Sequence, residues 1–164
     1  VEKVAISAAA VDNPGLVSEA ARCVGNQSIV VVIDVKKKAM FGRYDVWTHN
    51  GCKNTGKNPV EFAKQMENLG VGEIVINSID HDGMMKGYDL DLIDNIRKVI
   101  TVPLTVLGGA GSLGDIGGLI AKHGIIGAAA GSLFVFKGKF RAVLINYPNW
   151  LEKDVLIQKY YSAA

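Results

Sequence analysis

Residues 73–90 read Glu-Ile-Val-Ile-Asn-Ser-Ile-Asp-His-Asp-Gly-Met-Met-Lys-Gly-Tyr-Asp-Leu, and this stretch decides the fold. Residues 74–76 have the length and β-branched content of a buried strand. Polar residues follow at once, and Gly83 and Gly87 precede a helical pattern that begins near Asp89. Asp and Gly also serve in ordinary turns, but a buried strand that releases several acidic and hydroxyl groups into a loop is typical of an α/β-barrel active-site rim. We therefore favour a functional rim.

The composition is that of one soluble globular domain. The chain has 164 residues, of which 49% are hydrophobic and 21% charged. A net charge of +2 is too small to indicate a nucleic-acid partner, and we assign the lysine run at residues 36–38 to a solvated turn. Without an apolar stretch near the ~20 residues of a membrane helix, we expect no membrane partner. Two cysteines without a disulfide framework indicate a reducing cytoplasm.

The rest of the chain alternates strands with helices, which predicts a parallel sheet with right-handed crossovers. Five strands are expected, near residues 3–7, 29–33, 74–76, 103–107 and 127–130. A complete eight-stranded barrel takes ~250 residues, so we predict an incomplete (βα)8 barrel. Residues 1–164 form its single domain, with a helical tail from about residue 140. The chain starts at an element boundary, which suggests that it is the back part of a longer protein.

Turn and cap signals divide these elements. Residues 12–14 (Asp-Asn-Pro) predict a cap with proline at the first helical position, and residues 58–59 (Asn-Pro) and Ser112 predict two further helix starts. Residues 41–48 predict a small hairpin, and residues 50–56 a mobile loop.

Asp34 ends the apolar run at residues 29–33. A carboxylate there is either paired with Lys36 or placed for acid–base chemistry, and the end of a barrel strand favours the second. One carboxylate is only half of an acid–base pair, so Asp80 and Asp82 are candidates for positioning a ligand. The three histidines lack metal-ligand spacing, and we expect neither a metal nor another cofactor.

Two glycine-rich loops follow the last two predicted strands. Gly108-Gly109 and Gly131-Ser132 present bare backbone N–H groups that suit a phosphate dianion. Either pair alone also suits a tight turn. Two such loops after consecutive barrel strands favour a phosphate site.

Several segments, in order and with matching spacing, resemble the cyclase subunit of imidazole glycerol phosphate synthase. They are residues 31–34 (Val-Val-Ile-Asp), 50–56 (Asn-Gly-Cys-Lys-Asn-Thr-Gly), 72–83 (Gly-Glu-Ile-Val-Ile-Asn-Ser-Ile-Asp-His-Asp-Gly), 87–89 (Gly-Tyr-Asp), 108–111 (Gly-Gly-Ala-Gly) and 130–132 (Ala-Gly-Ser). The resemblance extends to about Phe136 and implies barrel strands four to eight. It implies a histidine-biosynthesis enzyme that takes ammonia from a glutaminase partner and closes the imidazole ring of a phosphorylated substrate, releasing an aminoimidazole carboxamide ribotide.

The resemblance also implies roles for individual residues. Asp34 matches the second catalytic aspartate of the family, a general acid, whereas the first belongs to a strand that the matched segments do not include. Lys3 and Glu73 match charged residues where ammonia enters the barrel. The residues assigned to the substrate and its phosphates are Ser7, Asn77, Ser78, Asp82, Gly83, Gly108, Gly109, Gly131 and Ser132.

Two further readings stay open. Ser7 and Leu107 depart from the family pattern, and residues 131–148 resemble a paralogue branch associated with ammonia-dependent amidation of a surface-polysaccharide sugar. Alternatively, the chain as given is an inactive assembly module, because five strands leave two open edges and an exposed inner face. We expect such a fragment to be a homo-oligomer or a partly molten monomer. The inner-face residues predicted for it are Val30, Val32, Val75 and Val106.

Overall fold

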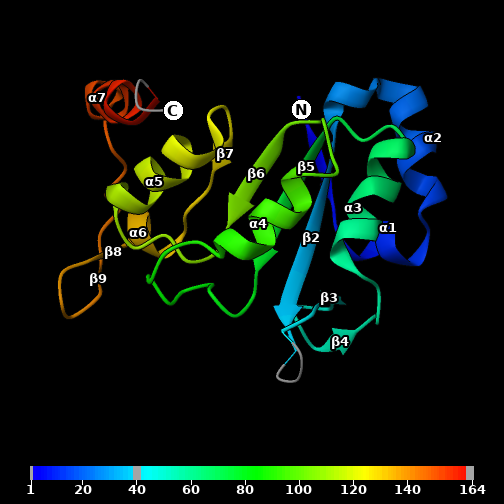
Figure 1. The fold of residues 1–164 in the computed structure, drawn as a ribbon, viewed down its shortest axis with the longest axis horizontal. Coiled ribbons are helices and arrows are strands. Elements are labelled where there is room, and N and C mark those ends of the chain that lie inside the picture. Colours follow the sequence, from blue (N-terminus) through cyan, green and yellow to red (C-terminus); the bar gives the residue numbers. More distant parts are fainter. Residues whose placement is uncertain (1, 39–41, 162–164) are drawn as a thin grey trace.

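The computed structural model describes residues 2–38 and 42–161, and its centre is a twisted sheet (Figure 1). Parallel strands pair in the order β1 (Val4–Ile6), β2 (Ile29–Lys37), β5 (Glu73–Ser78), β6 (Leu104–Leu107) and β7 (Gly127–Ala128). The predicted strands are therefore confirmed. With their helices they form an α/β fold that corresponds to part of a (βα)8 barrel.

One face of the sheet is closed by helices. Alternate strand residues point to this face, and Val31, Ile33, Ile74 and Ile76 are at most 1% exposed there. They share one apolar core with Phe62 and other helical side chains. The helices concerned are α2 (Gly15–Val24), α3 (Pro59–Asn68), α4 (Leu90–Arg97) and α5 (Leu113–His123).

The opposite face is the concave side that a barrel would enclose. Val32 pairs with Val75 and Asp34 with Asn77 across β2 and β5, and all four are half-buried. Val106 was predicted on this face, and that prediction is wrong. It pairs with Ile76 and is 2% exposed on the helix side. An uninterrupted apolar run carries no alternation, so the sequence alone does not tell its two faces apart.

The predicted helix starts at Asn58 and Ser112 are confirmed. The Asn58 side chain accepts a hydrogen bond from the Val60 N–H at 2.8 Å, with Pro59 opening the helix. Ser112 and Asp115 form a reciprocal capping box at the start of α5. These local signals set where two of the loops at the carboxyl end of the sheet give way to helix.

The first helical region differs from the prediction. A short helix, α1 (Ala8–Asp12), follows β1, and Asp12 ends it instead of capping the next. Pro14 is the N-cap residue of α2 and not its first helical residue. The Ala-rich start of α1 has no side-chain cap, so it gave no sequence signal. Beyond α2, the turn η1 (Asn26–Ser28) leads into β2.

An antiparallel extension follows β2. Strand β3 (Tyr44–Thr48) pairs with the end of β2, and β4 (Lys53–Asn54) pairs with β3. Of the hairpin predicted at residues 41–48, Tyr44–Thr48 form the single strand β3, whose antiparallel partners lie outside that range, and Phe41 lies outside the described residues. Two predictions are wrong here: the expected loop at residues 50–56 contains a strand, and two of the three lysines lie in β2 and not in a turn.

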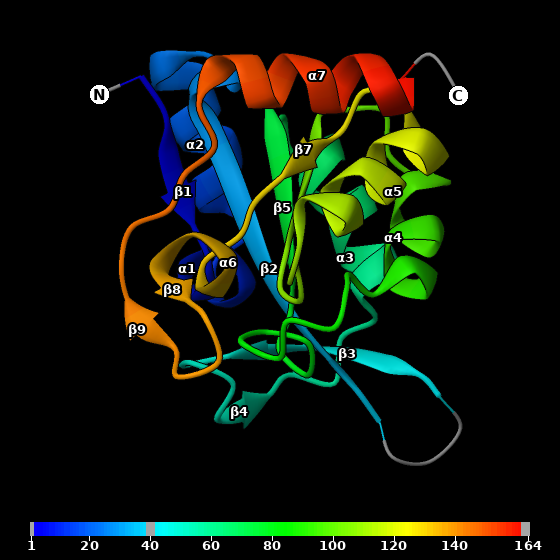
Figure 2. The ribbon, with the colours of Figure 1, turned by 90° about the vertical axis from the view of Figure 1, so that its left-hand side faces the viewer.

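The C-terminal part folds back along the molecule. Helix α6 (Ser132–Val135) leads into a hairpin of β8 (Phe136–Lys137) and β9 (Ala142–Val143). A last helix is present as predicted, α7 (Trp150–Tyr161), but it begins at Trp150 and not near residue 140, where β9 lies. Helix α7 crosses the end of the sheet where β2 and β5 begin (Figure 2). It packs on α5 closely enough that a Cβ at Gly117 would lie 2.3 Å from the Tyr160 ring.

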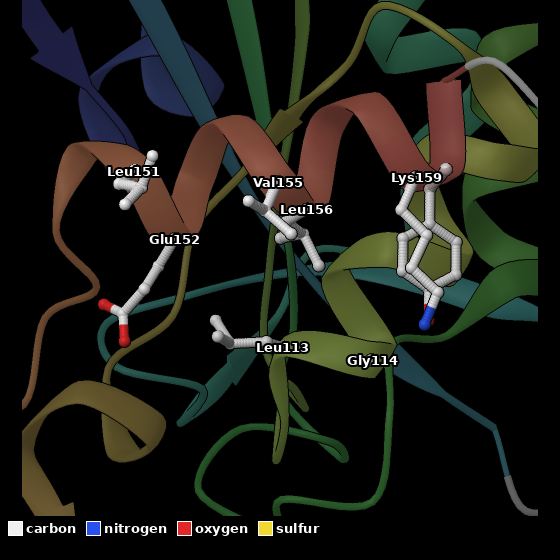
Figure 3. A pocket seen from close by; sticks show the side chains of 8 residues that line it. Leu113, Gly114, Leu151, Glu152, Val155, Leu156 and Lys159 are labelled. Carbon is white, nitrogen blue, oxygen red and sulfur yellow. The ribbon is translucent and has the colours of Figure 1, made fainter.

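A groove of about 460 Å³ lies between α5 and α7 (Figure 3). It is lined mainly by apolar side chains and contains none of the predicted site residues; its lining is Leu113, Gly114, Leu151, Glu152, Val155, Leu156, Lys159 and Tyr160. Among the described helices, none has the length and apolar character needed to cross a membrane.

Candidate functional site

Asp34 lies on the concave face, at the carboxyl end of β2. Its Oδ1 accepts a hydrogen bond from the Asn77 amide at 2.8 Å, and its Oδ2 a long one of 3.4 Å from the Ser7 hydroxyl. Asp34 and Asn77 lie on β2 and β5 and meet because they are in register, and Ser7 is the residue that follows β1. Lys36 instead places its ammonium 5.2 Å from the centre of the Trp47 ring. Among the described residues, no cation is within ion-pair distance of Asp34.

Only one of the two polar groups of the Asn77 side chain, its NH2 group, forms a hydrogen bond in the described part of the chain. Its side-chain oxygen is buried and has no hydrogen-bond partner among the described residues. A Cβ at Gly108 would lie 3.1 Å from this oxygen and 2.6 Å from the Ser78 carbonyl, and Gly108 has φ +93°. A glycine is therefore required where the loop after β6 passes the amide. An unpaired buried acceptor beside a carboxylate is suited to a ligand that donates a hydrogen bond.

Gly109 joins two of the predicted loops. Its carbonyl accepts a hydrogen bond from the Gly87 N–H at 2.8 Å, and a Cβ at Gly109 would lie 2.1 Å from the Gly87 carbonyl. The loop after β6 therefore rests directly on the loop after β5. Ser78, by contrast, is 4% exposed on the helix side of the sheet, so its side chain points away from that of Asn77.

Two other predicted segments meet further along the rim. A Cβ at Gly83 would lie 3.9 Å from the Ser132 hydroxyl, so the Asp82-Gly83 turn faces the Gly131-Ser132 loop. Asp82 itself is exposed. The structure thus brings most of the predicted substrate residues to the carboxyl end of the sheet. Their roles in binding stay predictions.

Lys3 and Glu73 lie at the opposite end of the concave face. The Lys3 ammonium forms an ion pair with the Glu73 carboxylate, which also accepts a hydrogen bond from the Thr105 hydroxyl at 2.7 Å. Burial alone would raise the pKa of Glu73, but hydrogen bonds from Lys3 and Thr105 outweigh it and hold this pKa below its usual value. Glu73 is therefore ionised and paired at neutral pH.

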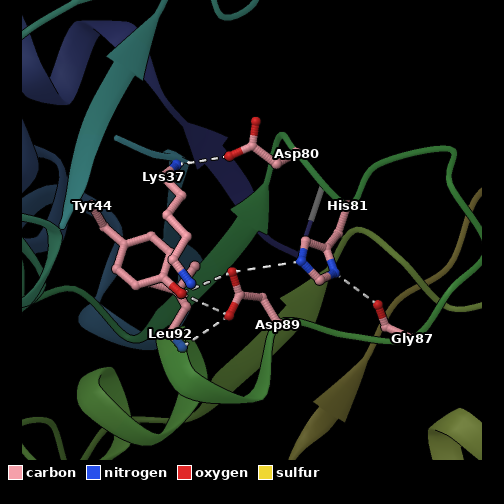
Figure 4. Close-up of polar contacts among 7 residues, drawn as sticks. All are labelled: Lys37, Tyr44, Asp80, His81, Gly87, Asp89 and Leu92. Carbon is pink, nitrogen blue, oxygen red and sulfur yellow. Dashed lines mark hydrogen bonds and ion pairs between the residues drawn. The ribbon is translucent and has the colours of Figure 1, made fainter. Parts of the chain in front are cut away.

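A second polar cluster was missed by sequence reasoning (Figure 4). The Tyr44 hydroxyl donates to both Asp89 oxygens, at 2.9 and 3.1 Å, and Asp89 also accepts from the Leu92 N–H at the start of α4. His81 places Nε2 3.8 Å from Asp89, and its Nδ1 lies 2.9 Å from the Gly87 carbonyl. The cluster ties β3 to the loop after β5. Tyr44 and Asp89 are 45 residues apart, so no local pattern predicts their contact.

The two tyrosines of this region are held neutral. Burial, followed by the hydrogen bond and charge of Asp89, raises the pKa of Tyr44 well above its ordinary value. Burial, with a smaller effect of the Asp115 charge, raises the pKa of Tyr88 to about 12. Its hydroxyl donates to the Ala129 carbonyl at 3.0 Å, which connects the loop after β5 to the end of β7. Both phenols therefore act as hydrogen-bond donors that fix the rim.

Metal-ligand geometry is absent from the part of the chain that the structure describes. No group of three or more His, Cys, Asp or Glu side chains is arranged there to hold an ion.

Comparison with known proteins identifies the family. A family model described as "Histidine biosynthesis protein" matches residues 1–141. The chain is 53% identical over 156 residues to "Putative imidazole glycerol phosphate synthase subunit HisF" of Leptospira interrogans, covering 95% of this chain and 61% of that protein. It is 44% identical over 155 residues to "Putative imidazole glycerol phosphate synthase subunit hisF2" of Pseudomonas aeruginosa, covering 94% and 61%.

A third relative carries the name without the word "putative". The chain is 38% identical over 153 residues to "Imidazole glycerol phosphate synthase subunit HisF" of Clostridium botulinum (strain 657), covering 93% of this chain and 59% of that protein. The chain thus spans about three fifths of the length of these relatives. It belongs to the histidine biosynthesis protein family, with relatives named as the HisF subunit of imidazole glycerol phosphate synthase.

Proposed function

We propose that the parent protein is an ammonia-dependent cyclase of the imidazole glycerol phosphate synthase type, with Asp34 as its proton-transfer residue. The observation that supports this most is the Asp34 carboxylate, held by the Asn77 amide at the carboxyl end of a barrel strand. Neutral donors orient the carboxylate while leaving it free of a fixed counter-ion, as a group that gives and takes a proton requires. The site is a rim facing solvent, where a substrate can approach.

The other predicted residues fit around this step. Asn77 and Ser7 orient the carboxylate, and the loops at Gly108-Gly109 and Gly131-Ser132 offer backbone N–H groups to a phosphorylated substrate. The Lys3–Glu73 pair lies at the far end of the same face, on the side where ammonia from a glutaminase subunit would enter. We infer a cytoplasmic enzyme with these two partners, substrate and glutaminase.

The test is Asp34→Asn in a full-length version supplied with an ammonium salt. Removal of a general acid–base group typically costs ~10²–10⁴-fold in turnover, and we expect a loss in this range. Asp12→Asn is the matched control, because Asp12 is exposed at the end of α1 and was not predicted to take part in the site. Turnover of Asp34→Asn within a few fold of the unmodified enzyme contradicts the assignment.

A second candidate is the paralogue activity, ammonia-dependent amidation of a surface-polysaccharide sugar. It is supported by Leu107, an apolar residue in register with Asn77 at the rim, and by Ser7, whose contact with Asp34 is long. Assaying the full-length protein plus glutaminase on both substrates separates the two activities.

A third candidate concerns the chain as it stands, which we propose is inactive alone and self-associates. Val32 and Val75 are only half-buried on the concave face, and apolar surface that meets water costs ~25 cal/mol per Å². A second copy packed by two-fold symmetry would cover this face. Sedimentation at micromolar concentration is the test. A well-ordered monomer that unfolds cooperatively would contradict self-association.

A further inference from the structure

The β8–β9 hairpin brings a basic segment to the rim. Residues 131–146 contain three basic residues and no acidic one, and Arg141 is the basic residue that reaches a neighbouring loop. Its Nη2 donates to the Gly83 carbonyl at 3.5 Å. Lys139, two residues earlier, instead places its ammonium 4.8 Å from the centre of the neighbouring Phe140 ring.

Three segments therefore converge at one point. Gly83 faces the Ser132 hydroxyl, and the Arg141 guanidinium touches Gly83 while it stacks 4.7 Å from the centre of the Phe136 ring. A guanidinium has five N–H donors, and the contact with Gly83 uses one of them. Asp82 is adjacent in sequence, yet among the described residues Arg141 has no ion pair with it or with another carboxylate. The positive charge is oriented by Phe136 but not neutralised.

The backbone at Arg141 favours a different residue. Its φ is +50°, in the left-handed region, where Gly or Asn is more easily accommodated. Arg141 closes the turn by donating its N–H to the Gly138 carbonyl at 3.0 Å, a bond that a glycine would also make. The turn therefore gives no reason for an arginine. We attribute the arginine at this position to the guanidinium that it brings to the rim.

We propose that Arg141 is a substrate-binding residue, which holds a phosphate group of the substrate at the rim between Gly83 and Ser132. This rests on the proposed function, in that it takes the carboxyl end of the sheet as the substrate site. The planar fork of a guanidinium matches two phosphate oxygens, and the Ser132 hydroxyl supplies another donor on the same side. Arg141 thereby selects a phosphorylated substrate and fixes which end of it points away from Asp34.

The experiment is a titration of inorganic phosphate into the chain at constant ionic strength, followed by NMR. We expect Arg141→Met to weaken binding by about 10-fold or more, because a charge-assisted hydrogen bond is lost. Lys139→Met removes the same charge from the same hairpin and should change affinity by less than about threefold, since it acts only through a screened field. Arg141→Lys, which keeps the charge without the fork, should fall between the two.

A variant that keeps the stability of the fold separates the effect of Arg141 on phosphate binding from its effect on folding. Arg141→Gly relieves the positive φ, so it should unfold at the same or a higher urea concentration while binding phosphate as poorly as Arg141→Met. In the unmodified chain, the Nε resonance of Arg141 should shift on addition of phosphate. An unshifted resonance, absence of phosphate binding, or equal affinities for Arg141→Met and Lys139→Met would each overturn the proposal. These readouts do not involve turnover, so they stand apart from the outcome for Asp34.

Discussion

The two ends of the concave sheet face carry similar residues in different electrostatic states. At the amino end, Glu73 forms an ion pair with Lys3 and accepts a hydrogen bond from the Thr105 hydroxyl. At the carboxyl end, Asp34 accepts only a hydrogen bond from the Asn77 amide at 2.8 Å and a long one from the Ser7 hydroxyl at 3.4 Å. Each is a carboxylate on a central strand, and each is contacted by side chains from two other segments.

The two clusters differ in whether their charges and polar atoms are paired within the chain. The Glu73 cluster compensates its charge with groups of the chain itself, as expected of a structural pair. The Asp34 cluster retains an uncompensated carboxylate and a buried Asn77 oxygen without a partner. Unsatisfied polar groups cost stability, and they persist where a ligand completes them. We therefore predict that the carboxyl end carries the chemistry, and that the Lys3–Glu73 pair, proposed above to lie where ammonia enters, also stabilises the amino end.

Asn77→Leu should lower turnover more than Ser7→Ala, another substitution at the carboxyl end. It removes the donor that orients Asp34, and a hydrogen bond to a charged group is worth about 1.5–3 kcal/mol, or roughly 10–100-fold in turnover. Steady-state turnover of the full-length enzyme is the measurement. Leu107→Met, an apolar substitution at the position paired with Asn77, is the control and should have turnover within a few fold of the parent. Equal losses in both variants would mean that the rim responds to packing and not to the amide.

Glu73→Gln should lower the free energy of unfolding by about 1–2 kcal/mol at neutral pH, because the ion pair and part of the Thr105 bond are lost. The pKa of Glu73 is lowered in the folded chain, so its contribution is present above the unfolded pKa and disappears as pH falls through the folded one. The two proteins should therefore converge in stability between about pH 5 and pH 3. Urea unfolding across this range is the measurement.

A pH-independent gap between Glu73→Gln and its parent would break the comparison, because it would show that lost packing and not lost charge destabilises the variant. Lys3→Met offers an independent check. It removes the cation from the same pair, so its stability loss should also shrink on acidification.

Ser7→Ala should have the smallest effect. The hydroxyl lies 3.4 Å from Asp34, near the limit of hydrogen bonding, so turnover should change by less than about threefold. Michaelis–Menten kinetics on the full-length enzyme measure this. A tenfold loss would show that the Ser7 contact tightens when substrate binds.

Local signals in the sequence predicted much of the fold. Asn58 and Ser112 start helices because a side chain and a backbone N–H two or three residues apart suffice for a cap. Asp34 was placed at the rim because a polar residue follows the apolar run, although β2 continues beyond it to Lys37. The face of Val106 and the short helix α1 were not predicted, because neither an unbroken apolar run nor an uncapped alanine stretch carries the relevant signal.

Contacts between distant segments account for the rest of the site. The sequence placed Asp34 and Asn77 on one rim, but their hydrogen bond depends on the register of β2 against β5. The Tyr44–Asp89 bond joins β3 to the start of α4, and Arg141 reaches Gly83 across 58 positions. Such pairs depend on the twist of the sheet and on loop paths, which no single stretch of sequence encodes.

The most direct test of the two-ended account is to measure turnover and unfolding on one preparation of full-length Asp34→Asn. The amide oxygen of asparagine can accept the Asn77 bond in place of the carboxylate, so we expect the free energy of unfolding to change by less than about 0.5 kcal/mol. Turnover should fall by ~10²-fold or more in the same sample. A loss of stability like that of Glu73→Gln, with turnover nearly unchanged, would show that Asp34 is a structural carboxylate and contradict the account.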